Sequence, residues 1–258
     1  MSNRTFENCE FLSLLINCQP KRIMFENCKF NDVTILSQKT NTSIRFNNCT
    51  ITKNLTVAPN SEGSEQLSFG VLDSKINALY IQSGLKTIEL DRSEINDISV
   101  RYGNENTNFN EVNIHDIKTK EIRFEYCDIK YLAISGLENT NNDLFNSKIN
   151  ELHIVNNIGV KHDFSKTEIT NLYAENQLNE YIIGDTTITE IKFTDNSIKR
   201  LTFTGNTFVG NIRNKKVTPQ VDDIKIECAV LRFAELTLLE NSKLHLSNYL
   251  VDLLASLR

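Results

Sequence analysis

FENCEF, at residues 6–11, returns as FENCKF at residues 25–30 and in a looser form as FNNCTI at residues 46–51. The cysteine keeps its place in each phrase, and successive cysteines lie 19 and 21 residues apart. A phrase that returns at a nearly constant interval is typical of a repeat architecture, in which each repeat stacks on the next. The cysteines themselves could be metal ligands, disulfide partners or a structural ladder.

Later phrases such as DSKINALYI and NSKINELHI fill the cysteine position mostly with serine or threonine. The residues at this position are Cys9, Cys28, Cys49, Ser74, Ser93, Cys127, Ser147 and Thr167. Because a metal ligand or a disulfide partner would not tolerate this replacement, we expect a ladder of small residues beside the core. The chain also has no C-x-x-C pair of the kind that binds zinc. We therefore predict no metal ion and no cofactor.

The apolar residues of each phrase follow the template Φ-x-x-Φ-x-Φ, where Φ is apolar, as in Ile149, Leu152 and Ile154. The same template recurs between the phrases, for example in LKTIEL, so the module is about ten residues and two modules make a coil of about twenty. The alternating end of the template is typical of a half-buried strand. We interpret the three-residue step as a corner at which the chain bends.

The fold predicted from this template is all-β: a single-domain parallel β-solenoid over residues 1–246 with a C-terminal helical cap at 247–258. Hairpin signals such as Asn-Gly are missing, which favours coiling over antiparallel pairing. The stretch 138–144 is polar and is expected to be a loop. Residues 229–241 could be strand or helix.

Asparagine often precedes the small residue of the ladder, and there we expect the left-handed backbone conformation and an amide ladder along the stack. These residues are Asn8, Asn27, Asn48, Asn146 and Asn241.

Charge and hydropathy narrow the possible partners. The net charge of −5 and the pI near 5.5 disfavour nucleic acid, which normally requires a basic surface. The sequence contains neither a membrane-spanning apolar run nor the apolar core of a secretory signal. We therefore expect a cytoplasmic chain without a membrane partner.

The phrases CEFLS and CKFND resemble units of the pentapeptide-repeat family, a resemblance that implies a four-sided right-handed β-helix and, in some members, mimicry of nucleic acid. The five-residue beat of that family is not kept here, since steps of five from Ile76 reach Ile81 but then Lys86 and Asp91. NSKINELHIVNN and NNCTITKNLTV resemble coils of pectate-lyase-like proteins and phage tailspikes. That resemblance implies a right-handed parallel β-helix that binds or cleaves polysaccharide, usually with aspartates or a calcium ion on one sheet. Leucine-rich repeats are a weaker resemblance.

Strict alternation of modules between two sheets would place Arg123, Asp143 and Asp163 on successive rungs of one outer face. Two carboxylates on neighbouring rungs, about 5 Å apart, could serve acid–base chemistry on a glycoside or bind calcium. The alternative is an Arg-Asp ladder on a solvated face. We therefore keep these three residues as weak catalytic candidates.

The other outer face would carry His153, Tyr173 and Lys192. The four histidines, His115, His153, His162 and His245, are scattered, and each is expected at the surface.

The function that the sequence favours is a non-enzymatic scaffold or protein-interaction module with a protein partner. A carbohydrate-active β-helix is the alternative, and an acidic inhibitor that mimics nucleic acid is a second one. Architecture alone carries no catalytic motif.

Overall fold

The computed structural model describes residues 3–17, 21–36, 41–58, 67–82, 85–101, 107–175, 178–194, 197–214, 220–235 and 244–246. Every regular element within these ranges is a β-strand. In this part of the chain no helix is long and apolar enough to cross a membrane. The chain divides into two compact units, 1–130 and 131–258, with the boundary inside strand β13.

The strands of the first unit are β1 (Asn3–Glu7), β2 (Glu10–Ile16), β3 (Arg22–Glu26), β4 (Lys29–Leu36), β5 (Thr42–Asn47), β6 (Thr50–Ala58), β7 (Leu67–Leu72), β8 (Lys75–Ile81), β9 (Leu85–Asp91), β10 (Glu94–Arg101), β11 (Thr107–His115) and β12 (Glu121–Glu125). Strand β13 (Cys127–Ser135) leads into the second unit. Its strands are β14 (Asn141–Phe145), β15 (Lys148–Val155), β16 (Ile158–Asp163), β17 (Glu168–Glu175), β18 (Leu178–Gly184), β19 (Thr187–Thr194), β20 (Ser197–Asn214), β21 (Gln220–Glu235) and β22 (Leu244–Leu246).

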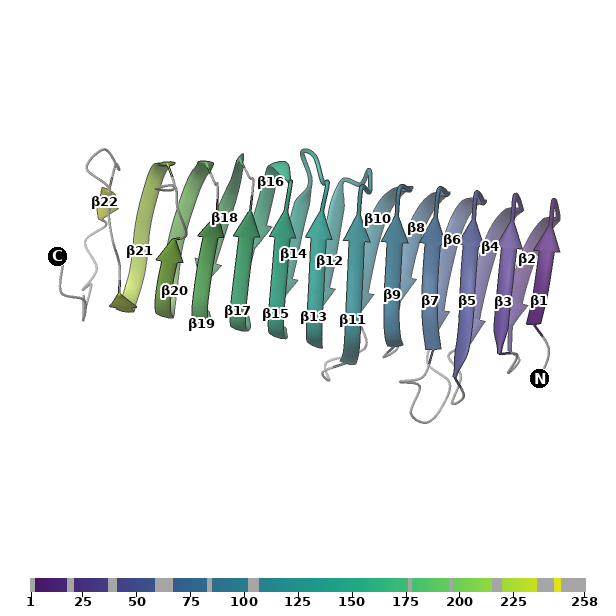
Figure 1. Cartoon of the computed structure of the whole chain (residues 1–258), viewed down its shortest axis with the longest axis horizontal. Coiled ribbons are helices and arrows are strands. Elements are labelled where there is room, and N and C mark those ends of the chain that lie inside the picture. Colours follow the sequence, from purple (N-terminus) through teal and green to yellow (C-terminus); the bar gives the residue numbers. More distant parts are fainter. Residues whose placement is uncertain are drawn as a thin grey trace. The chain divides into compact units, whose positions relative to one another are not determined.

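Each unit is built from parallel strands that form two sheets. From β1 to β19 each strand pairs with the strand two places along the chain, whereas the long strand β20 pairs with both β18 and β19, and β21 pairs with β20 and β22. In the first unit β1, β3, β5, β7, β9 and β11 form one sheet, and β2, β4, β6, β8, β10 and β12 form the other (Figure 1). The second unit repeats this scheme with β15, β17 and β19 in one sheet and β14, β16 and β18 in the other. The predicted parallel β-solenoid with coils of about 20 residues is confirmed.

The core of each unit lies between its two sheets and is made of the predicted Φ positions. Ile149, Leu152 and Ile154 are fully buried, as are Phe30, Val33 and Ile35 of β4, whereas in the first coil Phe11 and Leu14 are half-buried. Register keeps these positions above one another: Phe6 pairs with Phe25, which pairs with Phe46. The sequence template therefore corresponds to continuous apolar columns inside the solenoid.

The coil turns at the residue before the small-residue position, and this residue has a left-handed backbone. Asn8, Asn27 and Asn48 have φ angles of 54°, 53° and 49°, as predicted. Asn tolerates this region better than most residues because its short side chain can hydrogen-bond locally. The amide ladder is also present, since Asn48 Nδ2 donates to Asn27 Oδ1 at 2.7 Å. Asn241 lies outside the described residues.

The three-residue step of the template is not the corner that we predicted. Strand β4 continues through the step from Phe30 to Val33, and both of these side chains are buried. Its register with β2 is unbroken there. The register with β6 shifts at this point because β6 takes four residues, from Ile51 to Leu55, where β4 takes three.

The structure describes strands in two stretches that the sequence left as a loop or as ambiguous. The expected loop at 138–144 is partly wrong, because strand β14 begins at Asn141 and pairs with β16. The ambiguous stretch 229–241 is strand as far as Glu235, the last residue of β21, and its remainder is outside the described ranges. The predicted cap at 247–258 also lies outside them.

Candidate functional site

The strands β14 and β16 carry the predicted carboxylate pair. Asp143 and Asp163 are register partners on these neighbouring strands, and both are half-buried, as the alternation of modules predicted. Asp163 has a local role, because its Oδ1 accepts hydrogen bonds from the backbone N–H of Ser165 at 3.0 Å and from the Ser165 hydroxyl at 2.5 Å. These bonds fix the turn that leads out of β16.

Arg123 belongs to the first unit and is held there by a carboxylate of its own strand. Its Nη2 lies 3.0 Å from Glu121 Oε2 on β12, and both side chains are partly exposed. A surface ion pair of this kind contributes little to stability. It does, however, give Arg123 a partner other than the predicted aspartates.

The other sheet of the second unit brings together the residues predicted for the second outer face. His153 pairs with Tyr173, and Tyr173 pairs with Lys192, across β15, β17 and β19. The rings of His153 and Tyr173 stack with centroids 4.5 Å apart, and Tyr131 adds a third ring at 5.0 Å from His153. The sequence template did not identify Tyr131, because it lies outside the position between the last two Φ residues.

The cysteines form the structural ladder that we predicted. The backbone N–H of Cys9 donates to Cys28 Sγ at 3.5 Å, and that of Cys49 donates to Ser74 Oγ at 2.9 Å. Burial raises the pKa of the Cys28 and Cys49 thiols, which keeps them protonated and unreactive.

The prediction of one continuous small-residue ladder is wrong, because there are two series. Cys9 and its equivalents as far as Ser93 follow odd-numbered strands, whereas Cys127 follows the even-numbered β12. Ser147 and Thr167 likewise follow the even-numbered β14 and β16. The reason is spacing: Ser93 and Cys127 are 34 residues apart, and residues of one corner must be separated by whole coils.

One histidine overturns the prediction that all four lie at the surface. His162 is fully buried between the sheets of the second unit, at an inward position of β16. Its Nδ1 lies 3.0 Å from Asn142 Nδ2, and its Nε2 lies 3.5 Å from Asn179 Nδ2. Tyr181 stacks on the ring at 5.1 Å. His115 is exposed and His153 half-buried, while the side chain of His245 is outside the described part.

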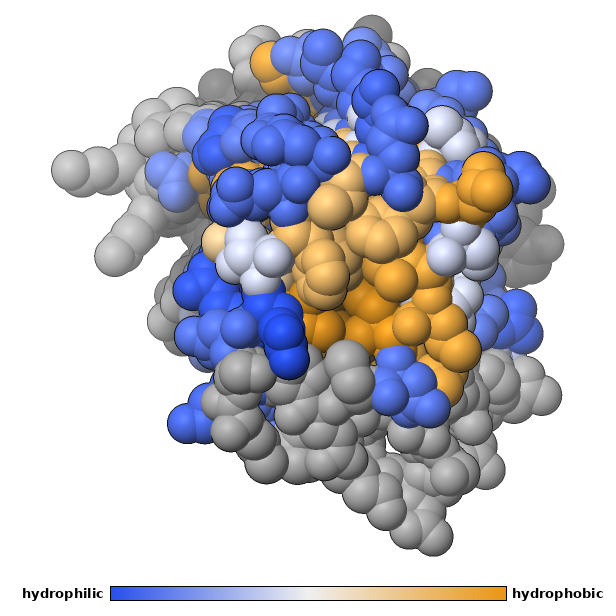
Figure 2. Space-filling view, turned by 90° about the vertical axis from the view of Figure 1, so that its right-hand side faces the viewer, coloured by the Kyte–Doolittle hydropathy of each residue, from blue (hydrophilic) through white to orange (hydrophobic). Residues whose placement is uncertain are grey.

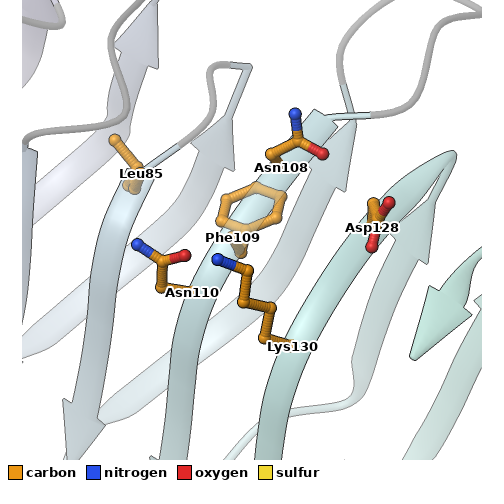
Figure 3. A pocket seen from close by; sticks show the side chains of 6 residues that line it. All are labelled: Leu85, Asn108, Phe109, Asn110, Asp128 and Lys130. Atoms are coloured by element: carbon orange, nitrogen blue, oxygen red, sulfur yellow. The ribbon is translucent and has the colours of Figure 1, made fainter. Parts of the chain in front are cut away.

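A cavity of about 260 Å³ opens where β9, β11 and β13 begin (Figure 3). Buried Leu85 and Phe109 provide its apolar floor. Its lining residues are Leu85, Asn108, Phe109, Asn110, Asp128 and Lys130. The volume lies just below the range of roughly 300–1,000 Å³ that is typical of ligand pockets. The lining carries one carboxylate, from Asp128, and one ammonium group, from Lys130, so it suits small polar molecules. It does not indicate a particular ligand.

Two features with functional potential were missed in the sequence. The first is a cluster of Asp91, His115 and Asp116, whose ligand atoms all lie within 4.8 Å of one another. Asp91 and His115 each end a strand, and each directly follows the last Φ residue of its module. Because equivalent positions of stacked modules lie above one another, the template could have predicted that these two residues are neighbours. The second is the first coil, where Leu12 and Leu15 are 86% and 62% exposed. Leu12 and Leu15 occupy x positions of the template, which are expected to face outward. The sequence alone could therefore have indicated exposed apolar side chains in the first coil.

These features define the chain as a protein of the parallel β-solenoid class. Comparison with known proteins adds no particular relative: no family model, curated protein or solved structure matches the chain.

Proposed function

We propose that the chain is a non-enzymatic protein-interaction module that binds its partner through its first coil. The observation that carries the proposal is the apolar surface of this coil. Five large hydrophobic side chains are exposed among the described residues, and three of them, Phe6, Leu12 and Leu15, belong to β1 and β2. Figure 2, which looks onto this end of the first unit, shows hydrophobic side chains gathered together, with hydrophilic side chains above and on either side of them. Such patches typically mark interaction sites.

The geometry of the first coil indicates what kind of partner it would accept. Strand β1 pairs with β3 and β2 with β4, and neither has a further neighbour within the described ranges. Their outer edges therefore offer N–H and C=O groups to an added strand. The ring of Phe6 stacks on Phe25 with centroids 5.1 Å apart, which leaves its opposite face for a side chain one rung further out.

Charge adds a second requirement. Arg4 is the register partner of Ile23, so it occupies a position that is apolar in the next coil. A charge at such a position disfavours indiscriminate edge-to-edge association. The partner that we propose is a protein segment that adds strands to β1 and β2, with apolar residues above Phe6 and Phe11 and an acidic residue above Arg4.

The double substitution Leu12→Asp and Leu15→Asp is expected to abolish this binding, because it replaces the two most exposed large apolar side chains of the first coil with charges that the partner would have to desolvate. Wild-type and variant chains would be immobilised side by side and exposed to extract of the native host. A stoichiometric protein retained by the wild type and lost from the variant supports the proposal. Its affinity for the purified chains should differ by roughly tenfold or more.

The matched control is Ser99→Asp, which adds a charge to the outer face of β10 in the same sheet, away from the first coil. Circular dichroism would establish that both variants retain their strands. The proposal fails if the retained proteins are the same for the wild type and the double variant, or if Ser99→Asp removes the partner equally.

A further inference from the structure

The ends of strands β9 and β11 bring two carboxylates and an imidazole together at one corner of the first unit. Asp91 is the last residue of β9 and pairs with His115, the last residue of β11. Asp116 follows with a φ of 49°, so the chain turns there. We propose that Asp91, His115 and Asp116 bind a divalent transition-metal ion such as Zn²⁺. This inference is independent of the proposed function.

The geometry is close to that of a metal site. One ligand atom from each residue lies within 4.8 Å of the other two. Bonds of about 2.0–2.2 Å would place ligand atoms of a tetrahedral zinc site roughly 3.4 Å apart. His115 and Asp116 are exposed, so small rotations of their side chains can close this difference. Asp91 is more buried and would be the fixed ligand.

Hydrogen bonding supplies an independent argument. Asp91 Oδ1 is buried and accepts no hydrogen bond from any described residue. The other oxygen, Oδ2, is paired with Arg92 Nη1 at 2.5 Å. A buried carboxylate oxygen without a partner is costly, and such groups commonly have an ion or a water molecule beside them. A bound metal ion would satisfy Oδ1 while Arg92 continues to orient the carboxylate.

The local charge also favours a divalent cation. Arg92 pairs with Asp73 at 2.9 Å and with Asp91 at 2.5 Å, and Asp116 also lies near enough to act on its charge. Three carboxylates against one guanidinium leave two negative charges when His115 is neutral. A divalent ion would balance them.

The ligand types select the class of metal. An imidazole nitrogen with two carboxylate oxygens suits Zn²⁺, Mn²⁺, Co²⁺ or Ni²⁺, whereas Ca²⁺ and Mg²⁺ prefer oxygen ligands alone. Because Asp91 and His115 lie on adjacent strands, the ion would join two neighbouring coils. The competing explanation is a plain surface ion pair, since His115 Nε2 lies 3.1 Å from Asp116 Oδ2.

Calorimetric titration of the metal-free full chain with ZnCl₂ would distinguish the two explanations. We expect the wild type to bind one Zn²⁺ with micromolar or tighter affinity, and Asp91→Asn or His115→Gln to weaken binding by roughly tenfold or more. Asp116→Asn should act in the same direction and fold normally, because Asn accepts the left-handed backbone. Zn²⁺ should also raise the melting temperature of the wild type, but not that of His115→Gln.

The matched control is His153→Gln. His153 Nε2 lies 3.6 Å from Glu151 Oε2, so it forms a histidine–carboxylate pair like that of His115, and no third ligand among the described residues joins it. This variant should bind Zn²⁺ as the wild type does. The inference is overturned if the wild type binds no Zn²⁺, if His115→Gln leaves the affinity unchanged, or if His153→Gln weakens binding equally.

Discussion

We expect the free energy of unfolding to fall as the pH drops below 6.5, and we expect His162→Gln to make this fall less steep. His162 is fully buried, and burial lowers the pKa of its imidazole from 6.5 to about 3. The groups packed against it are the amides of Asn142 and Asn179 and the ring of Tyr181, a phenol whose pKa burial raises. None of these side chains carries the negative charge that would stabilise an imidazolium ion.

The sign of the effect follows from linkage between protonation and folding. Above pH 6.5 the imidazole is neutral in both the folded and the unfolded chain, so its contribution to stability is fully present. Between pH 6.5 and about 3 the unfolded chain binds a proton that the folded chain does not. The free energy of unfolding therefore falls as the pH falls, by about 1.4 kcal/mol per pH unit. Two pH units correspond to roughly 3 kcal/mol.

Urea denaturation at pH 7 and at pH 4.5 would measure this difference in the wild type and the variant. Gln cannot titrate, so the free energy of unfolding of His162→Gln should change less between the two conditions, even if altered packing lowers its value at pH 7. His153→Gln, which removes a half-buried histidine, serves as the control for the loss of a histidine from the same unit. Parallel pH dependences for the wild type and His162→Gln would contradict the prediction.

Phe25→Ala is expected to cost about 3–5 kcal/mol in the free energy of unfolding, the usual range for a large aromatic residue removed from a core. The Phe25 side chain is 1% exposed. Its ring stacks between Phe6 at 5.1 Å and Phe46 at 5.0 Å and meets Phe30 edge-on at 5.3 Å. Truncation would leave a cavity inside the column that neighbouring coils cannot fill without moving.

Phe6→Ala is the matched comparison, because Phe6 holds the same place in the preceding repeat of the phrase. Its side chain is 38% exposed and has a stacked neighbour on one side, so we expect a loss of about 1–2 kcal/mol. Chemical denaturation of both variants measures the difference. Equal losses would mean that the first coil is packed as tightly as the second, and would weaken the case for an exposed first coil.

The sequence predicted the architecture well because a solenoid is built from local rules. The inward or outward direction of each residue depends on its place in a ten-residue module, and Ile149, Leu152 and Ile154 illustrate this in the structure. The turn at Asn27 was predictable for the same reason, since a left-handed backbone favours asparagine. The register of Asp143 with Asp163 followed from counting coils of equal length.

Features that depend on several coils could not be predicted from the pattern of a single module. The series of Cys9 and the series of Cys127 belong to different corners because the spacing between Ser93 and Cys127 is not a whole number of coils. His162 looks like a surface residue in its own strand. Its burial is tolerable because Asn142 and Asn179 come from neighbouring strands to meet it.

The sequence by itself determined the strands, the inward columns and the parallel stacking, because each depends on a pattern repeated along the chain. Only the tertiary structure decided which side chains from different coils meet: the buried His162 network, the Asp91, His115 and Asp116 cluster, and the exposed face of the first coil. The physical reason is that contacts between coils depend on the exact length of every intervening coil. A change of a few residues there moves a side chain to another corner without disturbing the local pattern.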